Sequence, residues 1–256
     1  YAQARTNSVT TGQRLLKNIF GPMAAQLINR LMDFGFAIFM LRLLGPELAG
    51  RYSFAIVVYG YFEIFSGFGL NTLLTREVAG DRRLAGRYLG ETLLLRAGLA
   101  LASLPLMAGV VVLLGWTSDL TSDAALVIML LGLTLIPGAL NGAITSLLQG
   151  FELMEYPAAI SLVTNIGKVM LGIAVLLAGF GIVGLAAVAV INSTVTALIF
   201  LWLYQNVRRR FDVRVEWQAS LATLGNAFPL MINNFLSSIF FRIDVLLLRV
   251  MQPCIG

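Results

Sequence analysis

The sequence predicts an all-α protein, a polytopic transmembrane helical bundle of about seven spans. Of its 256 residues, 58% are hydrophobic and 12% are charged, whereas an ordinary soluble domain has about 25% charged residues. The mean hydropathy of +0.85 leaves too little polar material to cover a soluble domain of this length. The apolar residues also gather in stretches of about 20, which as helices cross a hydrocarbon core of about 30 Å.

The predicted spans follow one another with short polar connections. They cover approximately residues 20–44, 49–70, 89–114, 124–148, 158–178, 181–204 and 227–250. The fifth and sixth spans are divided at Gly181 and Gly184, which favour a tight reversal. We expect a cytoplasmic N-terminal segment over residues 1–16, a first six-helix lobe over 17–210, and a linker with a seventh helix over 211–256 that opens a truncated second lobe.

The distribution of arginine and lysine predicts a cytoplasmic N-terminus, because positively charged segments resist translocation. Arg5, Arg14 and Lys17 precede the first span. The connections after the second and sixth spans contain Arg76, Arg82, Arg83, Arg87, Arg208, Arg209, Arg210 and Arg214. The connections on the other side are poor in positive charge. We therefore expect a multi-pass protein of the inner (cytoplasmic) membrane.

Several function classes are disfavoured by the composition. The chain has no histidine and one cysteine, Cys254, which excludes the usual zinc clusters and an internal disulfide. The net charge of +5 lies mostly between apolar stretches, a pattern typical of membrane topology and not of a nucleic-acid groove. We expect no enzyme activity, no metal, no cofactor and no nucleic-acid partner.

Charged residues inside the spans need an explanation, since insertion scales give each a cost of roughly 2.5–3.5 kcal/mol at the helix centre. They are Arg30, Asp33, Glu63, Glu91, Arg96, Lys168, Arg242 and Asp244. Arg30 and Asp33 are three residues apart and share a helical face, so they either form a structural ion pair or line a polar cleft together. Lys168 shares a face with Asn165, and it either meets an anionic substrate or pairs with an acidic side chain of another helix.

The remaining polar and aromatic residues have simpler interpretations. Arg87 stands four residues before Glu91, and interfacial pairing explains Glu91 and Arg96 without a functional role. Asparagines at positions 141, 192, 233 and 234 could bond between helices, and prolines at 105 and 137 could bend theirs. The aromatic second span could stack on a sugar, although contact with lipid or neighbouring helices is commoner.

Local motifs resemble the multidrug/oligosaccharidyl-lipid/polysaccharide flippase superfamily, in particular its Wzx-type polysaccharide (O-antigen) flippases. They are LLGPELAGRYSFA at residues 43–55, FGLNTLLTREVA at 68–79, RYLGETLLLR at 87–96 and LLQGFELMEY at 147–156. The resemblance implies a two-lobed protein, of which this chain would be the first lobe plus one helix. It also implies movement of an undecaprenyl-pyrophosphate-linked oligosaccharide to the outer leaflet by alternating access, for polysaccharide or lipopolysaccharide biosynthesis.

Site residues and partners follow from the same resemblance. Such flippases use charges of the first, second and seventh spans, which implies roles for Arg30, Asp33, Arg51 and Arg242. Lys168 of the fifth span joins them as a cation for an anionic substrate, so the expected substrate-binding residues are Arg30, Arg51, Lys168 and Arg242. Coupling to an ion gradient or membrane potential then implies a role for Asp33, Glu63 and Asp244. The expected partners are the lipid-linked oligosaccharide, membrane lipids and the polysaccharide polymerisation machinery. The alternatives are a drug-cation or lipid II exporter of the same superfamily, a membrane enzyme, or a non-transporting scaffold.

Overall fold

The computed structural model describes the backbone of residues 2–117, 122–207, 224–225 and 227–237, and the side chains of residues 21–116, 122–205, 224–225 and 227–237. Its helices are α1 (Ala2–Gly67), α2 (Leu70–Gly80), α3 (Ala85–Thr117), α4 (Ser122–Leu133), α5 (Leu135–Gly150), α6 (Glu155–Leu177) and α7 (Gly181–Val207). A short 3₁₀ turn, η1 (Arg82–Leu84), precedes α3, and residues 227–237 are helical at the start of the predicted seventh span. The prediction of an all-α bundle is confirmed.

Helix α1 supplies the first two predicted spans as two helices that meet at a kink. Gly45 has φ 77° and ψ 170°, outside the helical region, in a conformation that glycine adopts readily. Pro46 follows as the first residue of the second half, where its missing N–H removes no helical hydrogen bond. The two spans therefore join without a loop.

Four described helical stretches are long and apolar enough to cross a membrane: residues 82–116, 122–150, 155–177 and 181–205. They correspond to the third to sixth predicted spans, whereas the predicted first two spans in α1 contain more polar residues and do not meet the same standard. The second of the four stretches comprises α4 and α5, which are separated at Thr134, whose hydroxyl donates to the Leu131 carbonyl at 2.6 Å. This break lies one turn before Pro137, which cannot donate a backbone hydrogen bond. Large apolar side chains such as Leu113, Met170 and Trp116 are exposed on these helices, as lipid-facing side chains would be.

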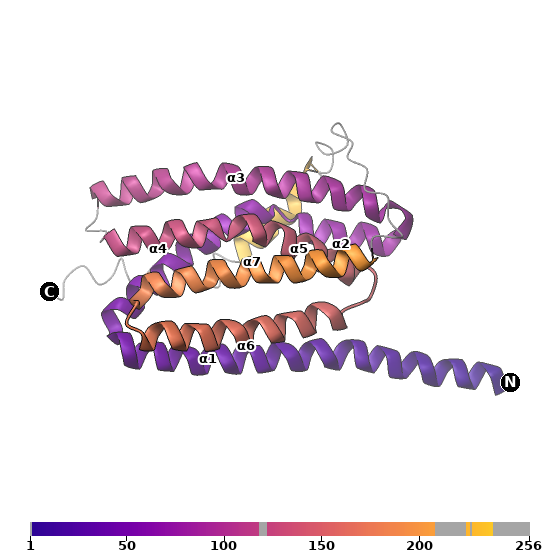
Figure 1. The fold of residues 1–256 in the computed structure, drawn as a ribbon. Coiled ribbons are helices and arrows are strands. Elements are labelled where there is room, and N and C mark those ends of the chain that lie inside the picture. The colour runs from indigo at the N-terminus through magenta and orange to yellow at the C-terminus, as the bar shows by residue number, and fades with distance from the viewer. Residues whose placement is uncertain (1, 118–121, 208–223, 226, 238–256) are drawn as a thin grey trace.

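The helices run back and forth between the two ends of the bundle. In Figure 1 the N-terminus, the start of α3, the α5–α6 connection and the end of α7 lie at one end, and the kink at Gly45 and the α6–α7 turn lie at the other. The α6–α7 turn uses positive φ at Gly179 and Gly181. Segments predicted to be cytoplasmic thus share one end of the lobe.

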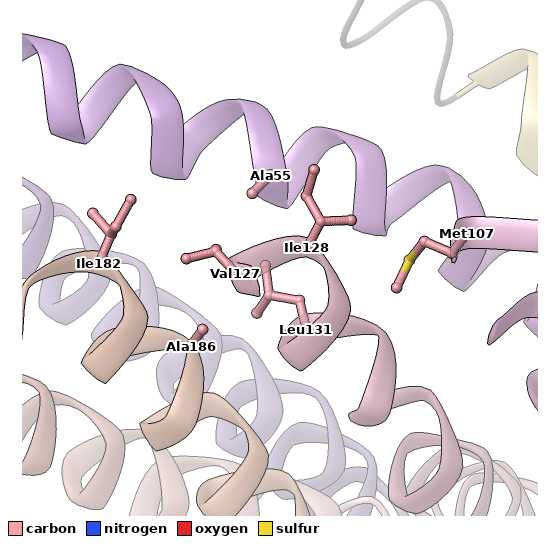
Figure 2. Close-up of a cluster of buried hydrophobic side chains, with 7 residues drawn as sticks. All are labelled: Ala55, Met107, Val127, Ile128, Leu131, Ile182 and Ala186. Atoms are coloured by element: carbon pink, nitrogen blue, oxygen red, sulfur yellow. The ribbon is translucent and has the colours of Figure 1, made fainter. Parts of the chain in front are cut away.

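The main apolar core joins four helices. It is formed by buried residues of α1, α3, α4 and α7 (Figure 2): Ala55, Met107, Val127, Ile128, Leu131, Ile182 and Ala186. Aromatic residues of the second half of α1, including Tyr59 and Phe62, pack around it. The rings of Tyr61 and Phe68 instead lie 6.5 Å and 6.3 Å from those of Phe235 and Phe228. Contact with neighbouring helices therefore accounts for most of the aromatic second span.

The segment after the second span, expected to be a connection, is largely the helix α2. Its apolar residues Leu70, Leu74 and Val78 are buried. The hydroxyl of Thr75 donates to the Ser146 carbonyl of α5 at 3.1 Å. The prediction erred because a short helix that packs against the protein, and not against lipid, lacks the length and hydropathy of a span.

Candidate functional site

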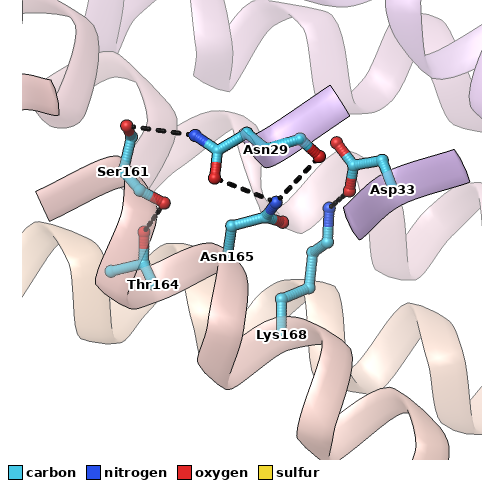
Figure 3. Close-up of polar contacts among 6 residues, drawn as sticks. All are labelled: Asn29, Asp33, Ser161, Thr164, Asn165 and Lys168. Carbon is cyan, nitrogen blue, oxygen red and sulfur yellow. Dashed lines mark hydrogen bonds and ion pairs between the residues drawn. The ribbon is translucent and has the colours of Figure 1, made fainter. Parts of the chain in front are cut away.

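Polar side chains of the first half of α1 and of α6 face each other where these two helices pack together at one side of the bundle. This α1–α6 polar seam consists of Asn29, Asp33, Ser161, Thr164, Asn165 and Lys168 (Figure 3). Its members recur at intervals of three or four residues on each helix, which places them along one face. The seam therefore follows directly from helical periodicity.

The charged part of the seam is an ion pair between α1 and α6. The Lys168 Nζ lies 2.8 Å from the Asp33 Oδ1, and the two side chains are 37% and 51% exposed. This contact confirms the alternative in which Lys168 pairs with an acidic residue of another helix. Of the two alternatives for Arg30 and Asp33, the ion pair between them is wrong within the described residues, because Asp33 pairs with Lys168 and the Arg30 side chain is exposed. Spacing along one helix does not reveal a partner on another.

The uncharged part of the seam is a set of amide and hydroxyl hydrogen bonds. The Asn165 Nδ2 donates to the Oδ1 of Asn29 at 3.2 Å and to its backbone carbonyl at 3.4 Å. The Asn29 Nδ2 in turn donates to the Ser161 hydroxyl at 3.3 Å. Asn165 and Thr164 are buried. These bonds hold α1 against α6 next to the ion pair, where interhelical hydrogen bonds replace water.

A cavity of about 510 Å³ continues the seam toward the end of the bundle where α5 joins α6. Its walls come from α1, α5, α6 and α7, and the seam residues Asn29, Ser161 and Thr164 belong to both features. Among the described residues that line it, none is charged. The other polar lining residues are Gln26, Asn141, Thr145, Gln149 and Thr196. The site therefore combines an uncharged cavity with an ion pair about one helical turn farther along α1.

Arg96 is another charged residue of the predicted spans and, unlike Asp33 and Lys168, it is buried. Arg96 of α3 is 6% exposed, donates a hydrogen bond to the Asn71 Oδ1 of α2, and interacts electrostatically with Glu63. Gly142 of α5 leaves the space that the guanidinium occupies, since a Cβ atom there would collide with it. The sequence interpretation placed Arg96 near the interface and missed this contact, because α2 was taken as a connection.

Other predicted residues are distributed over the lobe. Arg51 pairs with Glu47 at 2.6 Å, four residues away on the same helix. Arg87 pairs with the buried Glu91 at 2.8 Å, as the spacing predicted. Two further predicted site residues, Arg242 and Asp244, lie outside the described residues.

Carboxylates that could hold a cation are dispersed. In the ranges that the structure describes, no group of three or more His, Cys, Asp or Glu side chains gathers at one place. Asp33 lies in the first half of α1 and Glu63 in the second half, on opposite sides of the kink at Gly45. Within the described residues, a cation site built on Asp33 or Glu63 would therefore combine that carboxylate with uncharged oxygen ligands.

Comparison with known proteins gives a family and a fold. The family described as "Polysaccharide biosynthesis protein" matches residues 15–253. Among solved structures, a MOP superfamily transporter from Pyrococcus furiosus has 19% identity and a TM-score of 0.68, over 88% of this chain and 52% of that one. A multidrug resistance MATE family transporter of the MOP superfamily, in an outward-facing conformation, has 18% identity and a TM-score of 0.67, over 86% of this chain and 51% of that one. The chain thus spans about half the length of these structures. No curated protein matches it.

Proposed function

Because this chain belongs to the polysaccharide biosynthesis protein family and has the fold of MOP superfamily transporters, we propose that it forms the first lobe of a flippase. The full-length protein moves a lipid-linked oligosaccharide across the cytoplasmic membrane for polysaccharide biosynthesis. The carrier is undecaprenyl pyrophosphate, and the movement follows alternating access, in which two lobes open in turn to the two sides. The N-terminus is cytoplasmic.

One observation supports transport in particular: the Asp33–Lys168 pair sits inside two spans and is only partly buried. Charged residues within membrane helices commonly pair with one another, face the bundle interior or a water-filled cavity, and mark substrate or ion pathways. The pair also adjoins a polar cavity that reaches one end of the lobe. A scaffold that does not transport would have no need for such a polar path through its helices.

The proposed roles follow from charge. Arg30, Arg51 and Lys168 attract the pyrophosphate, for which arginine presents paired donors. The Asp33–Lys168 pair separates when a coupling cation binds Asp33 or when the substrate phosphate binds Lys168. Glu63 provides a second carboxylate for the cation. Arg242 and Asp244 are proposed to act from the second lobe.

The test is made in the source organism with the full-length gene. Its deletion should cause lipid-linked oligosaccharide to accumulate on the inner leaflet and should remove the surface polysaccharide, and a plasmid copy should reverse both effects. Unchanged surface polysaccharide and no accumulation in the deletion strain would refute the flippase assignment.

Export of drug cations is the second candidate function, because one similar structure is a multidrug resistance transporter. It is less well supported, since a cation site needs available acidic side chains, whereas Asp33 is already paired and the described cavity lining is uncharged. Efflux of a cationic dye from cells that express the full-length protein separates the two functions. Two results together would favour the drug exporter. Dye efflux would be faster in cells that express the full-length protein than in cells that lack it, and the deletion strain would keep a normal surface polysaccharide.

A further inference from the structure

The cavity between α1, α5, α6 and α7 has a regular arrangement of polar groups. On α5, Asn141, Thr145 and Gln149 are spaced four residues apart and line one wall. On α1, Gln26 and Asn29 also line the cavity, three residues apart. The cavity is therefore lined by side chains that fall on one face of each helix, and its volume of about 510 Å³ lies within the roughly 300–1,000 Å³ of small-molecule sites.

Several of these groups have unused hydrogen-bonding capacity. The Asn141 Nδ2 donates to the Ser193 carbonyl at 3.2 Å, but its buried Oδ1 has no partner among the described residues. The described part of the chain likewise offers no hydrogen bond to the side chains of Gln26, Thr145 or Gln149. A buried acceptor without a partner destabilises the folded protein, so a ligand hydroxyl that donates to the Asn141 Oδ1 would remove this penalty.

The chemistry of the lining selects the ligand. Amides and hydroxyls both donate and accept hydrogen bonds, which matches the hydroxyl groups of a sugar. The absence of charge from the described lining disfavours a phosphate or an organic cation, because either would be desolvated without an opposite charge. Phe200 and Pro22 give the wall an apolar part against which the C–H groups of a sugar ring can pack.

We infer that this cavity binds a neutral sugar residue of the transported lipid-linked saccharide, while the charged groups outside it attract the pyrophosphate. The inference rests on the proposed function and adds to it a saccharide subsite within the first lobe. Its principal residues are Asn141, Thr145 and Gln149, together with Gln26 of α1. Its lining includes Gln149 and Met154 at the α5–α6 connection, which lies at the same bundle end as the N-terminus in Figure 1, so with the proposed cytoplasmic N-terminus the subsite faces the cytoplasm.

Photo-crosslinking in polysaccharide-producing cells tests the subsite directly. A photoreactive amino acid is introduced into the full-length protein at position 145 or 149, or at the exposed Val163 of α6 as the control. After irradiation, the mass of the adduct is measured. We expect an adduct that contains both sugar and lipid from positions 145 and 149 but not from 163. An adduct of free sugar without lipid, or of phospholipid alone, would overturn the inference.

Conservative variants provide a second measurement that does not depend on the cross-linker. Thr145→Val and Gln149→Leu each remove hydrogen-bonding groups at nearly constant size, and each should lower the export rate about two- to tenfold at subsaturating substrate. Thr194→Val is the matched control, since the Thr194 hydroxyl bonds within its own helix to the Val190 carbonyl at 2.8 Å. Normal export by the double variant T145V/Q149L at normal abundance would exclude the subsite. This result would leave the flippase assignment intact if deletion of the gene still removes the surface polysaccharide, so the two proposals can be refuted separately.

Discussion

Replacing Lys168 with methionine would leave the Asp33 carboxylate without its partner inside the membrane spans. A lone charge at the centre of a membrane helix costs roughly 2.5–3.5 kcal/mol on insertion scales. The side chains of Lys168 and Asp33 are 37% and 51% exposed, so the surroundings screen part of this cost. We therefore expect K168M to lose about 1–2 kcal/mol of stability, roughly a 5- to 30-fold change in the folded-to-unfolded ratio.

The assay is thermal unfolding of the purified full-length protein, with D33N and the double variant D33N/K168M measured beside K168M. Each single variant leaves one charge unpaired, whereas the double variant leaves none and should recover most of the lost stability. Glu47→Gln is the control, because the Arg51–Glu47 pair is exposed and an exposed pair contributes only about 0–1 kcal/mol. A double variant as unstable as the singles would refute the argument, since the defect would then not come from unpaired charge.

Three further predictions concern packing and topology. Gly142→Ala should destabilise the protein by about 1–3 kcal/mol, because the new methyl group collides with the buried guanidinium of Arg96; an unchanged melting temperature would show that the guanidinium moves freely. Gly69→Ala should lower the free energy of unfolding by about 2–4 kcal/mol, since Gly69 has φ 70° and an added Cβ would lie 2.9 Å from the Cβ of Leu230. Chemical unfolding measures this loss of stability, and a variant as stable as the wild type would contradict the close approach. A cysteine at Arg83 in a C254S background should resist a membrane-impermeant maleimide in sealed cells, and modification from outside would reverse the proposed orientation.

The elements that the sequence predicted well are those fixed by local chemistry. The apolar stretches placed the boundary between the first two spans at residues 44–49, and the kink at Gly45 and Pro46 falls within it because both residues interrupt regular helical geometry. The Arg87–Glu91 pair was predicted because the two residues are four apart on one helix. In both cases the relevant atoms are within about one helical turn of each other.

The candidate site was only partly predictable because its contacts join distant segments. Asp33 and Lys168 were both recognised as intramembrane charges, but hydropathy does not say which helices are neighbours. Asn141 was expected to bond between helices and does so through its Nδ2, while its role in the cavity depends on the positions of three other helices. Arg96 was misplaced for the same reason, since its partner Asn71 belongs to a helix that hydropathy does not reveal.

The neutrality of the Asp33–Lys168 pair has a consequence for the electrical behaviour of the lobe. The membrane potential does work of about 2.3 kcal/mol per 100 mV on each elementary charge that crosses it. If α1 and α6 move together with their ion pair intact, the pair transfers no net charge, and the potential does not bias that movement. Separation of the pair gives each member its own coupling to the field. The 2.8 Å contact between Lys168 and Asp33 therefore determines whether this part of the lobe senses voltage.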